Sequence, residues 1–341
     1  MKAAVYTAPG TVEITTVPDA TPAGGDDVVV RVERCGICGS DLRALAIPPE
    51  MDYERGVVIG HEFVGEVVDA RGLAGVRDGD RVAVLPNIPC GRCHYCRAGR
   101  VNLCTDFTHL GAMRDGGAAE LAAVPAAMLH ALPEGLDWET AALTEPLACV
   151  LNGTRRARFH PGAPTLILGA GPIGLLFLAV ARLAGAGPIV VSEPHAERRA
   201  WAARHGADVV CDPTADSLEQ VVGDATDGVG AEIAIDAVGS LLADAVGAVR
   251  KGGRVLVFGL NFRAQATLSP ADIASREVTI EGVYIANGTF PLALSLLDAH
   301  PETFRPLITH RLALDAFWQG IEAMRDGSGM KVILDPTHRS N

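Results

Sequence analysis

The stretch TLILGAGPIGLLFLAVARL at residues 165–183 decides the fold. A short apolar strand pattern leads directly into the spacing GxGxxG, and an apolar helical pattern follows it. This order is typical of a dinucleotide-binding unit, because glycines let the backbone approach a pyrophosphate and the helix N-terminus offers it unpaired N–H groups. Glycines kept only for helix–strand packing are the alternative. The residues expected at the cofactor in this turn are Gly169, Gly171, Pro172, Ile173 and Gly174.

The next strand pattern ends in Glu193, 19 residues after Gly174. An acidic side chain at this spacing can accept hydrogen bonds from a ribose diol. Its carboxylate would repel the additional phosphate of NADP, so the sequence predicts NAD(H). The basic residues His195, Arg198 and Arg199 lie close by and act against this preference, and Arg198 is also expected at the cofactor.

The chain shows two kinds of sequence pattern. Up to about residue 140 it consists of short strand patterns separated by Gly, Pro and Asp, for example at 28–33, 65–70 and 80–85. From about residue 148, strand patterns alternate with helical ones, which is typical of a doubly wound parallel sheet. At 341 residues a single core is unusual. The sequence therefore predicts an α/β protein with two domains.

Composition excludes several classes of protein. Hydrophobic residues make up 48% of the chain and charged residues 21%, which rules out a wholly disordered or fibrous chain. The net charge of −12 repels nucleic acid and anionic lipid. Residues 160–181 lack charged side chains, but prolines and glycines divide them into a strand, a turn and a helix. With no signal-peptide pattern at the N-terminus, we expect a cytoplasmic protein that binds neither nucleic acid nor membrane.

Four of the eight cysteines lie in CGRCHYCRAGRVNLC. Two CxxC steps and a fourth cysteine eight residues on can surround one tetrahedral zinc ion and leave no open position. Such an ion would stabilise a lobe at about 88–106 without taking part in chemistry. Two disulfides or an iron–sulfur cluster are the alternatives. The expected ligands of this structural zinc are Cys90, Cys93, Cys96 and Cys104.

A second, open metal site is predicted from CGICGSD and GHE, which contain Cys38 and His61. Each residue alone is a weak signal, because single buried cysteines and histidines are common. Together they match a catalytic zinc, which has three protein ligands and one exchangeable position. The neighbouring Ser40, Asp41 and Glu62 are expected to serve catalysis, with the two carboxylates orienting the imidazole.

The third ligand of this site is left open by the sequence. Glu145, in TEPLACV, is the first candidate. Cys149, one helical turn later, and Glu62 itself are the competitors.

These motifs resemble those of the medium-chain, zinc-dependent alcohol and polyol dehydrogenases. CGICGSD, GHE, the four-cysteine lobe, TEPL, GAGPIG and the terminal KVILDP occur in the order and spacing of that family, and they cover essentially the whole chain. The branch that acts on sorbitol, threonine and butanediol fits best, because it has Glu in an EPL motif.

The resemblance implies a GroES-like catalytic domain formed by 1–148 and 289–341, with a Rossmann NAD-binding domain at 149–288. It implies Glu145 as the third ligand of the catalytic zinc and Lys331 as a basic partner of the pyrophosphate. A homo-oligomer, either a dimer or a homotetramer, is usual in the family.

The implied reaction is hydride transfer from a secondary alcohol to NAD⁺. Zinc held by Cys38, His61 and a glutamate would act on the substrate hydroxyl as a Lewis acid, and Ser40 would pass the proton outward. Arg43 stands where the family commonly has a relay histidine, and it stays protonated, so the outer relay must differ.

Three alternatives share the fold. They are a zinc-free quinone or enoyl reductase, an NADPH-dependent carbonyl reductase and a non-catalytic NAD(H)-binding or structural homologue. Intact Cys38 and His61 favour the zinc enzyme with two zinc ions per chain. Sugar alcohols, cyclitols, vicinal diols and amino alcohols all fit as substrates.

Overall fold

The computed structural model describes residues 1–337. The chain divides into two compact units. The discontinuous unit consists of Met1–Ala148 and the chain from Ala286 onward, and the central unit is Cys149–Ile285. Helix α4 (Thr144–Ala157) contains the first junction. That the discontinuous unit carries the catalytic site and the central unit the cofactor stays a prediction.

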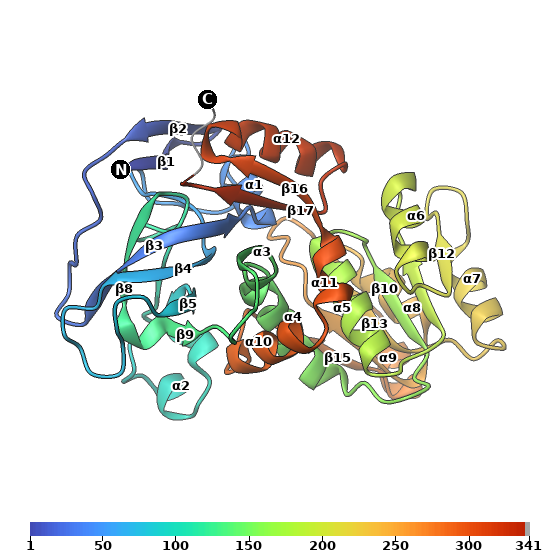
Figure 1. Ribbon diagram of the computed structural model, residues 1–341. Helices are drawn as coiled ribbons and strands as arrows, with labels where there is room; N and C mark the ends of the chain where they lie inside the picture. The colour runs from blue at the N-terminus through green and yellow to red at the C-terminus, as the bar shows by residue number, and fades with distance from the viewer. Residues whose placement is uncertain (338–341) are drawn as a thin grey trace. The chain divides into compact units, whose positions relative to one another are not determined.

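The central unit is built on a six-stranded parallel sheet in the order β12-β11-β10-β13-β14-β15 (Figure 1). In chain order this is 3-2-1-4-5-6, the order of dinucleotide-binding sheets. The buried strands β10 and β11 are continuous apolar runs, as expected where both faces of a parallel sheet are covered. The strands are β10 (Thr165–Leu168), β11 (Ile189–Ser192), β12 (Val209–Cys211), β13 (Ala231–Asp236), β14 (Val249–Val257) and β15 (Thr279–Gly282).

Five helices alternate with these strands. They are α5 (Pro172–Leu183), α6 (Ala196–Arg204), α7 (Leu218–Ala225), α8 (Leu242–Ala248) and α9 (Pro270–Arg276). Helix α5 is apolar along most of its length and buries eight consecutive residues from Gly174 onward. One hydrophobic core joins β10 and β13 to α7 and α8 through Leu166, Ala234, Val222 and Ala245. The predicted doubly wound sheet is therefore present.

The discontinuous unit contains a seven-stranded, mostly antiparallel sheet. Its order is β16-β17-β3-β4-β5-β9, and β8 also pairs with β3. Strand β3 is the longest, and it pairs with β4 on one edge and with β8 and β17 on the other. The strands are β3 (Asp27–Gly36), β4 (Glu62–Asp69), β5 (Arg81–Val84), β8 (Leu121–Pro125), β9 (Leu129–Ala131), β16 (Ile308–Ala313) and β17 (Lys331–Asp335). The C-terminal part of the chain thus completes the sheet that the first 131 residues begin.

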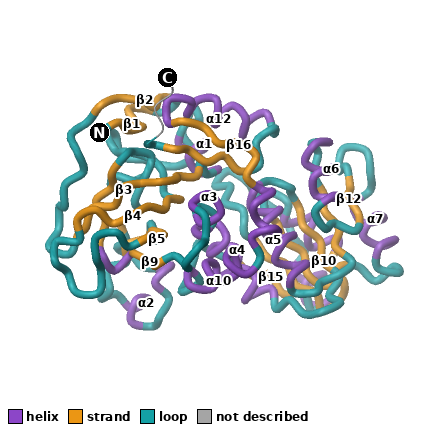
Figure 2. The backbone as a smooth tube through the Cα atoms, in the orientation of Figure 1, coloured by secondary structure: helices purple, strands orange, loops and turns teal. Residues whose placement is uncertain are grey.

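Two small sheets and several short helices complete this unit. The small sheets pair β1 (Lys2–Ala8) with β2 (Thr11–Thr16) and β6 (Asn87–Ile88) with β7 (Thr108–His109). Much of the chain between β5 and β8 is loop (teal in Figure 2), and it carries the four-cysteine lobe. The helices are α1 (Gly39–Ala44), α2 (His94–Arg97), α3 (Trp138–Ala141), α10 (Phe290–Ala299), α11 (Pro301–Phe304) and α12 (Phe317–Asp326), with 3₁₀ turns η1 (Val101–Leu103), η2 (Ala126–Met128), η3 (Arg305–Leu307) and η4 (Leu314–Ala316).

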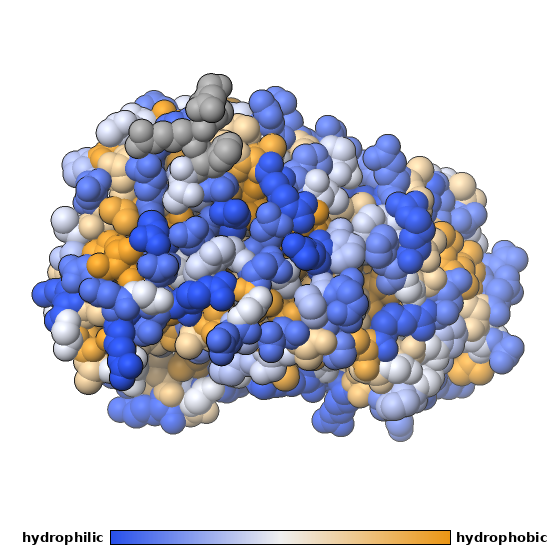
Figure 3. All heavy atoms as spheres, in the orientation of Figure 1, coloured by the Kyte–Doolittle hydropathy of each residue, from blue (hydrophilic) through white to orange (hydrophobic). Residues whose placement is uncertain are grey.

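The surface mixes hydrophilic and hydrophobic side chains. Figure 3 shows one face of the molecule, on which hydrophilic residues predominate and hydrophobic ones form scattered smaller patches. Such a mixture is normal for a folded protein. Within residues 1–337, no helix combines the length and the apolar character that crossing a bilayer requires.

Candidate active site and cofactor site

The four cysteines of the predicted structural zinc site lie together between β6 and β7. One sulfur from each lies within 4.8 Å of the others. Each cysteine contributes its single Sγ atom to this group, and the Sγ atoms of Cys93 and Cys104 are 3.9 Å apart. Thiolates bound at about 2.3 Å to one tetrahedral zinc ion are about 3.8 Å apart, so the thiol arrangement fits this ion.

Short local elements position these thiols, and backbone N–H groups favour the ionised form of Cys93. Cys93 is the N-cap of α2, and its Sγ accepts a hydrogen bond from the N–H of Cys96 at 3.4 Å. Backbone N–H groups of Cys96 and Thr105 lower the pKa of Cys93 to about 6. The Sγ of Cys104 accepts from the N–H of Cys90 at 3.3 Å. N–H groups directed at sulfur stabilise the thiolate, which is the form that binds metal.

Cys38, His61 and Glu62 form a second group of potential ligands. One ligand atom from each lies within 4.8 Å of the others. Cys38 caps α1, whereas His61 and Glu62 stand where β4 begins. His61 is 4% exposed, and its Nδ1 is buried without a hydrogen-bond partner among the described residues. A partly buried thiol beside a buried imidazole and a buried carboxylate is a donor set that suits catalytic zinc.

Asp41 and Ser40 lie beside the His61 imidazole, and the Tyr53 hydroxyl contacts both of them. The Asp41 carboxylate lies 3.9 Å from His61 Nδ1 and accepts a hydrogen bond from the N–H of Cys38 at 2.9 Å. Ser40 Oγ lies 3.4 Å from His61 Nε2. Tyr53 donates to Asp41 Oδ1 at 2.9 Å, and burial raises the pKa of its hydroxyl well above the usual value. The phenol therefore keeps its proton and holds the carboxylate that faces the imidazole.

Glu62 has a second partner besides this group. Its carboxylate forms a buried ion pair with the ammonium group of Lys331, from β17. Lys331 Nζ also donates to the carbonyl of Ile37 at 3.1 Å. The basic side chain expected near the pyrophosphate thus contacts Glu62, and its role toward a cofactor stays a prediction.

Glu145 lies in the first turn of α4 and is 8% exposed. Burial raises the pKa of Cys38, and the carboxylates of Asp41 and Glu145 act in the same direction. Glu145 is therefore within electrostatic reach of the Cys38 thiol, although the close group found among the described residues contains Glu62 instead. Cys149 is buried at the start of the central unit.

In the central unit, the glycine turn joins β10 to α5. Gly169 has φ +95°, a conformation that side chains disfavour. A Cβ on Gly174 would lie 1.9 Å from the Gly169 carbonyl oxygen, so the helix can approach the strand this closely only at glycine. A Cβ on Gly171, the N-cap of α5, would meet nothing within 4 Å. Pro172 and Ile173 begin the helix. The backbone beside Gly171 is therefore open to a ligand.

Glu193 follows β11 and faces this turn. Its carboxylate accepts hydrogen bonds from the N–H of Ala170 at 2.7 Å and of His195 at 3.0 Å. Each oxygen still has capacity for another donor, such as a ribose hydroxyl. Arg199 forms an ion pair with Asp212 at 2.7 Å. Arg198 lies in the first turn of α6 and is partly buried.

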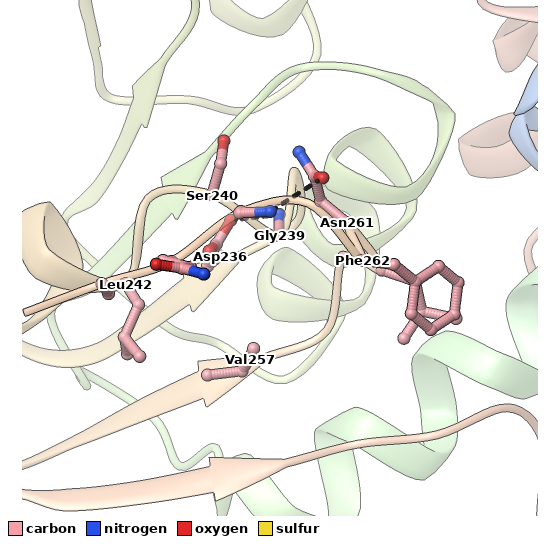
Figure 4. A pocket seen from close by; sticks show the side chains of 12 residues that line it. Asp236, Gly239, Ser240, Leu242, Val257, Asn261 and Phe262 are labelled. Atoms are coloured by element: carbon pink, nitrogen blue, oxygen red, sulfur yellow. Dashed lines mark hydrogen bonds between the residues drawn. The ribbon is translucent and has the colours of Figure 1, made fainter. Parts of the chain in front are cut away.

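A cavity of about 260 Å³ lies at the carboxyl ends of β13 and β14 (Figure 4). In sheets of this kind, ligands bind outside the carboxyl ends of the strands. The cavity is close to the glycine turn, because a Cβ on Gly169 would lie 2.7 Å from a methyl group of Val238. Its lining includes Asp236, Gly239, Ser240, Val257, Asn261 and Phe262.

Asp236 shapes the wall of this cavity. Its carboxylate accepts hydrogen bonds from the N–H groups of Val238, Gly239 and Leu241 at 3.0, 2.7 and 2.9 Å. These bonds fix the loop that follows β13. The arrangement extends the candidate cofactor site beyond the predicted glycine turn.

Sequence reasoning missed three residues of these sites, namely Tyr53, His109 and Asp236. The ring of His109 packs edge-on against that of His61, with centroids 5.1 Å apart. Burial lowers the pKa of His109 to about 3, and His61 adds to this effect, whereas the Leu110 backbone opposes it. Only Asp236 had a local signal, since it ends an apolar strand pattern at the carboxyl edge of the sheet.

Comparisons with known proteins agree with this architecture. Two family models match, the alcohol dehydrogenase GroES-like domain at residues 24–134 and the zinc-binding dehydrogenase at residues 172–299. The sorbitol dehydrogenase of Halalkalibacterium halodurans is 31% identical over 98% of this chain and 99% of its own. The L-threonine 3-dehydrogenase of Pyrococcus horikoshii is 34% identical over 98% of both chains. A protein described as a zinc-binding dehydrogenase from Sinorhizobium meliloti, solved with NADP, superimposes with a TM-score of 0.92 at 34% identity, covering 98% of this chain and 99% of that one.

The chain belongs to the medium-chain, zinc-dependent alcohol and polyol dehydrogenases. It is an oxidoreductase that acts on CH–OH groups, in a family whose cofactors are zinc and a nicotinamide dinucleotide. The predicted family, fold class and class of reaction are thereby confirmed. The roles of individual residues stay predictions.

Proposed function

We propose that this enzyme transfers hydride between NAD(H) and a secondary alcohol or ketone of a polyol, sugar, cyclitol or diol. The observation that carries the proposal is the convergence of the partly buried Cys38 thiol with the buried side chains of His61 and Glu62. Similarity to sorbitol and threonine dehydrogenases supports a substrate with more than one polar group.

In this proposal Cys38 and His61 hold the catalytic zinc, and Glu62 is the third ligand, because its carboxylate lies within 4.8 Å of the ligand atoms of both. Glu145 is the competing ligand. Zinc held there would supply Lewis acidity toward the substrate hydroxyl. Asp41 orients the His61 imidazole, since it faces Nδ1 at 3.9 Å.

Ser40 Oγ would relay the proton of the reacting hydroxyl, accepting it while its own hydroxyl proton passes outward to solvent. It lies 3.4 Å from both His61 Nε2 and the Tyr53 hydroxyl, so it borders the proposed ligand shell. Arg43, on the same helix, cannot accept a proton near neutral pH. The proton therefore leaves by a route that does not use residue 43.

NAD(H) is the proposed cofactor because the Glu193 carboxylate faces the glycine turn. A 2′-phosphate placed near this carboxylate would be repelled. The NADP bound to the Sinorhizobium meliloti protein supports the competing proposal, an NADPH-dependent carbonyl reductase. Comparing kcat/KM for NAD⁺ and NADP⁺ distinguishes the two proposals.

Cys38→Ser is the variant that tests the proposal. We expect zinc content to fall from about two to about one per chain and polyol oxidation to be lost, because only the four-cysteine site keeps its ligands. Cys211→Ser is the matched control, since Cys211 lies outside both groups and should leave both quantities unchanged. Full zinc content and turnover in Cys38→Ser would refute the proposed metal site.

We further propose a homo-oligomer, either a dimer or a homotetramer, located in the cytoplasm. The family resemblance supports the assembly. The four-cysteine lobe is proposed to hold the structural zinc. Sedimentation of the purified protein gives the number of subunits.

A further inference from the structure

We propose that Asn87 and His109 form a hydroxyl-recognising pair, which binds a second hydroxyl of the substrate next to the one that is oxidised. The inference rests on the proposed function and narrows its substrate to vicinal diols and polyols.

The two residues face the same way on a short hairpin. Asn87 and His109 are directly opposite each other in the antiparallel pairing of β6 with β7. Side chains of residues directly opposite in such a pair project to the same face, with Cβ atoms about 4.5–5.5 Å apart. The Asn87 amide and the His109 imidazole are therefore neighbours.

Their polar atoms have no partners in the described part of the chain. Oδ1 and Nδ2 of Asn87 and Nδ1 of His109 are all buried and make no hydrogen bond with residues 1–337. Asn87 as a whole is 8% exposed. Leaving buried polar atoms unpaired costs free energy, and most are satisfied by protein or bound molecules. Three such atoms on one face of a hairpin point to a polar ligand.

The pair lies at the candidate active site. The His109 ring packs against that of His61 with centroids 5.1 Å apart and ring planes at 69°. His109 is not part of the metal-ligand group identified in residues 1–337. It therefore borders the site where the reacting hydroxyl would lie, without competing for the metal.

The chemistry of the pair matches a hydroxyl group. An amide offers an acceptor oxygen and donor N–H groups, and a neutral imidazole offers one donor and one acceptor. A hydroxyl can donate to Asn87 Oδ1 and accept from an N–H at the same time. A simple secondary alcohol without the second hydroxyl would leave these buried atoms unpaired, and sites of this kind discriminate against such analogues.

The test compares 2,3-butanediol with 2-butanol in the zinc-loaded enzyme. Calorimetry with NADH bound gives the dissociation constants of both alcohols in a complex that cannot react, and kcat/KM with NAD⁺ gives turnover. We expect His109→Phe and Asn87→Leu each to reduce the preference for the diol about tenfold or more, with little effect on 2-butanol, because one bonding partner is removed. Zinc content should stay at about two per chain.

His130→Phe is the matched control. His130 is another partly buried histidine of the same unit, and it packs against Phe290 with ring centroids 5.0 Å apart. This variant should keep the diol preference. The melting temperatures of His109→Phe and Asn87→Leu show whether a change in substrate preference comes from a packing defect. Replacing unpaired polar atoms with apolar ones should not lower stability.

An active enzyme whose diol preference is unchanged in both variants would overturn the inference. So would an equal loss of affinity for both alcohols. If the parent enzyme oxidised no alcohol or polyol at all, the proposed function itself would fail, and this inference with it.

Discussion

The Lys331 ammonium group and the Glu62 carboxylate form an ion pair in the interior of the discontinuous unit, with 3% and 2% of their side chains exposed. The pair joins β17 to β4, which pair with β3 on its two edges. Gly36, on β3, makes room for it, because a Cβ there would lie 2.3 Å from Glu62 Oε2 and 2.9 Å from Lys331 Nζ. The carboxylate that we propose as a zinc ligand is thus tied to the framework of the sheet.

In the protein without its catalytic zinc, Lys331→Met should lower the free energy of unfolding by about 3–5 kcal/mol, because it leaves the Glu62 carboxylate buried without its partner. Urea unfolding measures the change. In the double variant with Glu62→Gln the loss should be smaller, since no uncompensated charge remains. Arg92→Met is the control, because its pair with Asp106 has side chains 82% and 68% exposed and should contribute less than about 1 kcal/mol. Equal effects of Lys331→Met and Arg92→Met would contradict the argument.

Cys93→Ser should remove the structural zinc and leave the catalytic one. Metal analysis should give about one zinc per chain, and the melting temperature should fall by about 5–10 °C, because metal binding to a site absent from the unfolded chain contributes to folding. His94→Ala is the control, as it changes the exposed residue next to Cys93 and keeps all four thiols. A variant with one zinc and an unchanged melting temperature would show that the lobe is stable without metal.

Alanine substitutions at two glycines of the same turn should have different effects, one on stability and the other on cofactor binding. Gly174→Ala should destabilise the protein by more than about 2 kcal/mol, since its Cβ would lie 1.9 Å from the Gly169 carbonyl oxygen. Gly171→Ala meets no atom within 4 Å and should fold normally, but its methyl group should keep the pyrophosphate from the backbone and weaken NAD⁺ binding at least tenfold. Unfolding curves and NADH fluorescence titration measure the two effects. Normal cofactor affinity in Gly171→Ala would place the pyrophosphate elsewhere.

Local sequence patterns were sufficient to predict the glycine turn and the clustering of the four cysteines. In both cases the atoms that come together belong to one short segment, so spacing alone determines which residues can meet. The alternation of strands and helices likewise predicted the parallel sheet of the central unit, because each strand there is a short apolar run between turn residues.

Contacts between distant strands could not be predicted in this way. The pairing of Asn87 with His109 depends on where a hairpin closes around the cysteine lobe, and neither residue belongs to a motif. The ion pair of Glu62 and Lys331 spans 269 positions and needs the order of β17, β3 and β4 in the sheet. Family resemblance suggested that Lys331 is functional, but only the fold shows its contact with Glu62.

Glu193 should determine the choice between NAD⁺ and NADP⁺. Glu193→Ala removes the acceptor for the ribose hydroxyls and the charge that repels a 2′-phosphate, so kcat/KM should fall about 10- to 100-fold with NAD⁺ and rise with NADP⁺. Glu193→Gln keeps an acceptor oxygen and the size of the side chain, so it separates lost hydrogen bonding from lost repulsion. Arg199 should contribute little to NADP⁺ binding in either variant, because it forms an ion pair with Asp212 at 2.7 Å. A parent enzyme that prefers NADP⁺ would contradict this prediction, and it would direct attention to Arg198 as the residue that binds the phosphate.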